Sequence, residues 1–93
     1  MIFTHSHWDH ILGFPFFKPI YSKKARILIH GCNLHQGNME LLLSRTMDAP
    51  YFPVPYSQVQ ASIEFTNACF TSMRIDSITV RTIPLSHPNM GLG

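Results

Sequence analysis

Residues 4–10 of the chain read Thr4-His5-Ser6-His7-Trp8-Asp9-His10, and they carry the most specific pattern in the sequence. The apolar residues just before them suit the last part of a buried strand. In an extended segment, residues two apart face the same side, so His5 and His7 can present their imidazole rings to one ion. If the backbone turns into a helix after Trp8, Asp9 and His10 lie near a second point close by.

These residue types are metal ligands. Imidazole and carboxylate groups suit zinc, and they also suit manganese or iron, without any thiolate. Three histidines with one carboxylate leave room for a water molecule, which is typical of a catalytic rather than a structural metal. A hydroxide formed on such an ion at neutral pH would be the nucleophile of a hydrolase.

Outward from this stretch, the first half of the chain mixes helical and extended patterns. Residues 11–14 predict one helical turn that ends at Pro15. The apolar, proline-containing residues 13–21 predict an irregular segment packed against other apolar groups. Residues 27–30 (Ile-Leu-Ile-His) predict a strand buried on both faces, which is more common in parallel sheets. A loop is expected at 31–37.

The second half begins with the clearest helix of the sequence. Asn38 can cap a helix that runs to Met47, because apolar side chains recur there at helical spacing. Residues 48–55 hold three prolines and predict an extended loop, and a helical turn is expected at 56–60. Alternating apolar residues predict one strand around Ile63 and another over about 77–83. His87 follows in a loop, and the whole order predicts a mixed α/β fold.

Composition limits the class of protein. Only 13% of the 93 residues are charged, against 45% hydrophobic. Soluble domains average about 25% charged residues, so this balance suggests a piece of a larger core. The net charge of +2 comes from scattered residues, which gives no support for a nucleic-acid surface. The sequence shows neither a transmembrane run nor a signal peptide.

The two cysteines, Cys32 and Cys69, cannot form a disulfide scaffold, and no C-x-x-C pair is present. One bridge between them is conceivable, but we expect a reduced chain in the cytoplasm, with Cys69 as a small buried apolar residue. The group His30, Cys32 and His35 is interpreted as a strand end and a loop rather than as a second metal cluster. We expect Trp8 to be a packing residue, and we expect residues 14–17 to fill the core rather than to line a pocket.

The pattern His-x-His-x-Asp-His after a strand, followed by Gly13, resembles that of the metallo-β-lactamase-fold hydrolases. Ser86-His87-Pro88 stands where that family places its next histidine ligand. Residues 4–17 and 48–55 are most similar to the phosphodiesterase-like branch. The resemblance implies an α/β fold of the αββα sandwich type. It implies one metal held by His5, His7 and His87, and a second to which Asp9 and His10 contribute. Asp9 could also orient the attacking water.

The chain departs from the family pattern in what it lacks. In that family a bridging aspartate and a final histidine follow His87, and several strands precede the first histidine. We therefore expect residues 1–93 to be the central part of one hydrolase domain, without its N-terminal strands and its C-terminal ligand region. Up to two zinc ions would bind the complete domain. This chain should bind at most one zinc ion tightly, and it should hydrolyse substrate slowly or not at all.

The function expected from the resemblance is metal-dependent hydrolysis of an ester-type bond, with a small-molecule or phosphodiester substrate and a phosphodiester preferred. Two alternatives stay open. The chain could be a truncated metal-binding product without catalytic activity, or a lactone or thioester hydrolase of the same fold. Among the partners considered, a nucleic acid has the least support. We expect no membrane partner, and the oligomeric state stays open.

Overall fold

The computed structural model describes residues 1–32, 38–66, 69–87 and 91–92. Three strands form a parallel sheet in the order β1-β2-β3, and helices connect them, so the fold is mixed α/β as predicted. Residues 33–37, which include His35 and most of the predicted loop, and Pro88 lie outside the described part. The strands of this sheet are β1 (Ile2–Phe3), β2 (Arg26–Gly31) and β3 (Ser62–Thr66).

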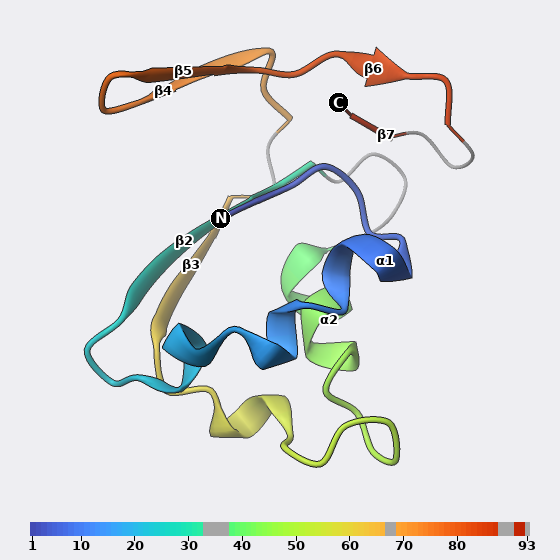
Figure 1. The fold of residues 1–93 in the computed structure, drawn as a ribbon, viewed down its shortest axis with the longest axis vertical. Coiled ribbons are helices and arrows are strands. Elements are labelled where there is room, and N and C mark those ends of the chain that lie inside the picture. The colour runs from blue at the N-terminus through green and yellow to red at the C-terminus, as the bar shows by residue number, and fades with distance from the viewer. Residues whose placement is uncertain (33–37, 67–68, 88–90, 93) are drawn as a thin grey trace.

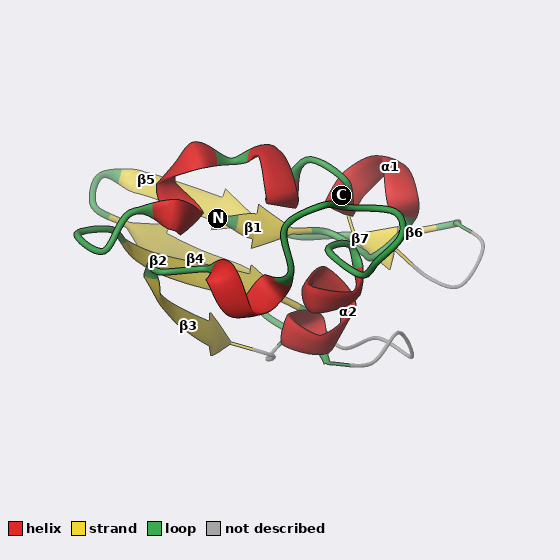
Figure 2. Cartoon of the chain, turned by 90° about the horizontal axis from the view of Figure 1, so that it is seen from below, coloured by secondary structure: helices red, strands yellow, loops and turns green. Residues whose placement is uncertain are grey.

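Helical segments lie on one face of this sheet (Figures 1 and 2). Between β1 and β2 the chain forms α1 and two 3-10 helices, and between β2 and β3 it forms α2 and a third 3-10 helix. The segments are α1 (Trp8–Ile11), η1 (Phe14–Phe16), η2 (Lys18–Tyr21), α2 (Met39–Arg45) and η3 (Tyr56–Gln58).

A β-hairpin lies toward the other side of the sheet (Figure 1). Its strands β4 (Ser72–Ile75) and β5 (Ile78–Arg81) pair antiparallel through a two-residue turn. Asp76 occupies the left-handed region in that turn, with φ of 51°, a conformation that aspartate tolerates better than most residues. The chain continues into β6 (Pro84–Leu85), which pairs antiparallel with β7 (Gly91–Leu92).

The core lies between the parallel sheet and the helices. Its most buried side chains are Ile20 of η2, Ile29 of β2, Leu43 of α2, and Met47 in the turn after α2. Gly31 at the end of β2 permits close packing of α2. A Cβ atom at this position would lie 2.6 Å from Cε of Met39.

Strand β2 is buried on one face only, which corrects the expectation of a strand buried on both faces. Ile27 and Ile29 pack into the core, whereas Leu28 on the opposite face is 46% exposed. The alternation of side chains along a strand explains the difference, because the helices cover one face of the sheet. The predicted parallel pairing of this strand is confirmed.

The helical turn after the histidine stretch begins earlier than predicted. Helix α1 starts at Trp8 and ends at Ile11, and Pro15 lies inside η1 instead of ending a turn. Proline at the first positions of a helix is tolerated because its missing N–H would have no partner there. Residues 13–21 are therefore mostly helical turns rather than irregular, although Phe14 and Ile20 are buried as expected.

The hairpin also differs from its sequence-based prediction. Ser77 lies in the turn and not in a strand, so the predicted strand over 77–83 shortens to β5. Its partner β4 was not predicted. Ser72–Ile75 are mostly exposed, and a short strand with little burial carries only a weak apolar alternation. The strand around Ile63 and the loop at 48–55 are confirmed, the loop containing turns.

Cys32 and Cys69 form a disulfide in the structure, which contradicts the expectation of reduced cysteines. The cause is the parallel pairing of β2 and β3, in which His30 lies beside Thr66. Segments leaving the same edge of the sheet are therefore neighbours, although 37 positions separate the cysteines in sequence. Cys69 is exposed rather than a small buried apolar residue. In the described part of the chain, no helix has the length and apolar character needed to cross a membrane.

Helix α2 follows its sequence prediction closely. The Asn38 side chain accepts a hydrogen bond from the backbone N–H of Leu41, at 3.3 Å, as an N-cap residue does. Met39, Leu43 and Met47 form the buried stripe. The last residues of the predicted helix, 46 and 47, form a turn after Arg45.

We expect Asn38→Ala to lower the free energy of unfolding by about 1 kcal/mol, because one N–H of the first turn of α2 loses its acceptor. Urea unfolding followed by circular dichroism measures the change. Asn38→Ser is the matched control, since a serine hydroxyl can accept the same hydrogen bond. Equal destabilisation by both substitutions would show that capping is not the cause.

Candidate metal centre

Three imidazoles from distant parts of the chain meet at one edge of the sheet. His5 lies two residues after β1, His7 is the N-cap residue of α1, and His87 lies in the loop after β6. One ring nitrogen of each lies within 4.8 Å of the corresponding nitrogen of the other two. The structure thus brings together the three residues that the resemblance assigns to one metal.

The rings pack closely around His5. The ring centroids of His5 and His7 are 4.9 Å apart, and those of His5 and His87 are 4.6 Å apart. The centroids of His7 and His87 are 4.8 Å apart. His5 is only 5% exposed, whereas the other two are half-buried. The group is therefore open to solvent on the side of His7 and His87.

The two ring nitrogens of His5 differ in their hydrogen bonding within the described part of the chain. Its Nδ1 atom lies 3.0 Å from the hydroxyl oxygen of Thr4. Its Nε2 atom is buried and has no hydrogen-bond partner among the residues that the structure describes. A hydrogen bond at one ring nitrogen fixes the orientation and the tautomer of a histidine, as it does for many metal-bound histidines. Sequence reasoning did not single out Thr4, although a hydroxyl residue directly before a ligand histidine is a usable signal.

The pKa of His5 is lowered from its usual value of 6.5. Burial is the main cause, because the charged ring would lose its hydration. Positive charge on His10, His87 and His7 acts in the same direction, and the Asp9 carboxylate opposes it more weakly. The neutral ring is therefore favoured in the folded chain.

We expect the metal-free protein to lose stability as the pH falls below about 6.5. The unfolded chain then takes up a proton on His5 that the folded chain resists, so the free energy of unfolding falls with falling pH. Urea unfolding in EDTA across this range measures the effect. His5→Gln should flatten the dependence, and an unchanged slope in this variant would contradict the assignment to His5.

Asp9 and His10 lie beside the three-histidine group and not within it. The Asp9 carboxylate is 80% exposed and lies 3.4 Å from Nε2 of His10. The His10 ring centroid is 4.0 Å from that of His5. Both residues belong to α1, which begins directly after His7. The structure therefore places them as a neighbouring acid–base pair.

The donor set fits a tetrahedral divalent ion. Zinc–nitrogen bonds of about 2.0–2.1 Å place ligand nitrogens roughly 3.3 Å apart. The nitrogens here lie within 4.8 Å of one another, so small side-chain rotations would bring them into range. Three nitrogen ligands leave the fourth position open to water, as in catalytic zinc sites.

Trp8 differs from its expected packing role, because its side chain is 68% exposed. Residues 14–17 only partly fill the core as expected, because Phe14 is buried there whereas Phe16 is 73% exposed. His30 lies on β2, outside the three-histidine group, and its buried Nδ1 atom has no hydrogen-bond partner in the described ranges.

Comparisons with known proteins add no relative, since the chain matches no protein-family model, no curated protein and no solved structure.

Proposed function

We propose that this chain carries the first metal site of a metal-dependent hydrolase of the metallo-β-lactamase fold. The substrate class we propose is an ester-type bond, with a phosphodiester preferred. The metal is zinc, although manganese or iron would also suit these ligands. His5, His7 and His87 would hold the ion, and the ion would supply an activated water at neutral pH.

The buried Nε2 atom of His5 is the observation that carries this proposal. A buried polar atom without a partner costs about 1–3 kcal/mol, so native structures rarely keep one without a reason. This atom belongs to a group of three imidazoles, and the Thr4 hydroxyl lies at the opposite ring nitrogen. A bound cation would satisfy the orphaned atom.

Asp9 and His10 give the site its proton-accepting groups. They lie next to His5 and are accessible to solvent. In our proposal this pair takes up the proton released when water attacks, and Asp9 orients that water. The helices, the parallel sheet and the hairpin also lie in successive layers, in line with part of an αββα sandwich (Figure 1).

Hydrolysis of bis(p-nitrophenyl) phosphate tests the proposed function. Because the chain should bind only one metal ion tightly, we expect slow release of nitrophenol that depends on zinc, that EDTA abolishes and that added zinc restores. His7→Ala should lower the rate at least about 100-fold, because it removes a ligand. Lys23→Ala, an exposed residue before β2, is the matched control and should keep the rate.

Parallel assays with a lactone and a thioester separate the hydrolase classes. Activity on the lactone alone would exclude the phosphodiester. Tight zinc binding without turnover of any substrate would favour the other candidate, a metal-binding chain without catalytic activity.

A further inference from the structure

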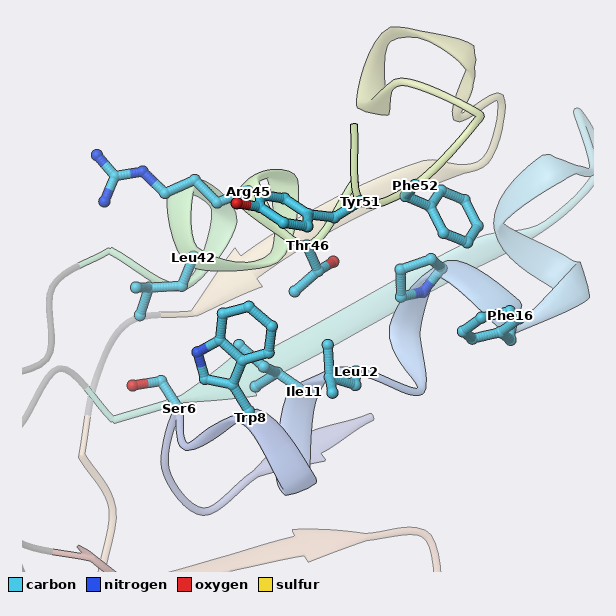
Figure 3. Close-up of a pocket in the computed structure, with 11 residues that line it drawn as sticks. Ser6, Trp8, Ile11, Leu12, Phe16, Leu42, Arg45, Thr46, Tyr51 and Phe52 are labelled. Atoms are coloured by element: carbon cyan, nitrogen blue, oxygen red, sulfur yellow. The ribbon is translucent and has the colours of Figure 1, made fainter. Parts of the chain in front are cut away.

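A cavity of about 460 Å³ lies between α1 and α2, and none of the three clustered histidines lines it (Figure 3). Ser6 and Trp8 line it, whereas His5 and His7 join the metal group. Within residues 5–8, side chains therefore alternate between the metal group and the cavity. The volume lies within the roughly 300–1,000 Å³ typical of small-molecule pockets.

Aromatic side chains form much of the wall of this cavity. Trp8 and Leu12 lie on the α1 side, and Tyr51 and Phe52 lie on the opposite side (Figure 3). Phe16 closes one end through an edge-to-face contact with Phe52, with ring centroids 5.4 Å apart. Such walls favour a planar aromatic ligand, which can stack against them.

Three of these rings are exposed to an unusual degree. Trp8 is 68% exposed, Phe16 73% and Tyr51 80%, although large aromatic residues gain most from burial. An exposed apolar patch of this kind typically marks a binding site.

Arg45 is the only charged residue that lines the cavity within the described part of the chain. Its side chain begins close to Tyr51, and its guanidinium points outward, away from the rings (Figure 3). Among the described residues, no carboxylate forms an ion pair with it. Rotation of this exposed side chain can bring the charge to an anionic group that projects from the pocket.

We infer that this pocket binds a small molecule with a planar aromatic ring and a negatively charged substituent. The ring lies between Trp8 and Tyr51, and the anion meets Arg45. This site goes beyond the proposed hydrolase function and does not require the metal.

Trp8 is the only tryptophan of the chain, so its indole N–H gives one NMR signal that reports on the pocket. The probe is 2-naphthalenesulfonate, titrated in EDTA so that the metal site cannot contribute. We expect a saturable shift of the indole signal. Methanesulfonate should give none, and the neutral 2-naphthalenesulfonamide should bind more weakly. An absent shift, or equal binding of the sulfonamide, would overturn the inference.

Two substitutions locate the ligand. Thr46→Phe fills the cavity from the turn after α2 and should remove the saturable shift, whereas Leu41→Phe, at an exposed position on α2, should keep it. Arg45→Gln should weaken sulfonate binding about two- to fivefold and leave sulfonamide binding unchanged. Because Arg45 is exposed, Arg45→Gln should fold normally. It therefore still tests the inference if Thr46→Phe does not fold. Unchanged sulfonate affinity in Arg45→Gln would refute the role of the charge.

Discussion

Replacing His87 with alanine should weaken zinc binding at least about 100-fold, because substitutions of the outer partners of metal ligands already cost 10–100-fold. His87 contributes one of the three clustered nitrogens. Isothermal calorimetry measures the affinity and the stoichiometry together. For the unsubstituted chain we expect one tightly bound equivalent, since Asp9 and His10 lie outside the group.

His10→Ala is the matched control for this experiment. It also removes an imidazole near His5, but one that the structure pairs with Asp9. Its effect on zinc affinity should be far smaller than that of His87→Ala. Unchanged affinity in His87→Ala, or two tightly bound equivalents in the unsubstituted chain, would refute the three-histidine site.

Leu43→Ala should lower the free energy of unfolding by about 2–5 kcal/mol. Leu43 is fully buried at the centre of the core, so the substitution removes apolar contacts and leaves a cavity. Urea or thermal unfolding in EDTA measures the change without a contribution from metal binding. A loss this large is a substantial part of the stability of a small domain.

Leu41→Ala makes the same chemical change on the same helix at a side chain that is 51% exposed. Its effect should stay within about 0.5 kcal/mol, as for most surface substitutions. Similar losses in the two variants would mean that helix α2 does not pack on the sheet as described.

The candidate metal site was only partly readable from the sequence. The spacing of His5 and His7 already indicates two ligands, because that signal lies within a few residues. The third ligand, His87, came from a family resemblance and not from any local pattern. The tertiary structure shows it beside His5. The His10 ring also lies close to His5, at 4.0 Å between centroids, but His10 is not one of the three residues whose ligand atoms cluster.

The fold, too, was predictable from the sequence only in its local elements. Periodic apolar residues determined α2 and the strands around Ile29 and Ile63, and a side-chain oxygen determined the N-cap at Asn38. These features depend on neighbours one to four positions apart, which a sequence displays directly.

Contacts between distant residues were decided by the tertiary structure alone. Parallel pairing of β2 with β3 brings Cys32 to Cys69, and the packing of α1 near α2 turns Trp8 and Arg45 into walls of one cavity. Neither result follows from periodicity, because it depends on strand register and on which helix faces meet. The sequence by itself determined the elements with clear apolar periodicity, and it indicated His5 and His7 as candidate ligands. The assembled chain determined the position of the third candidate ligand, His87, the disulfide and the pocket.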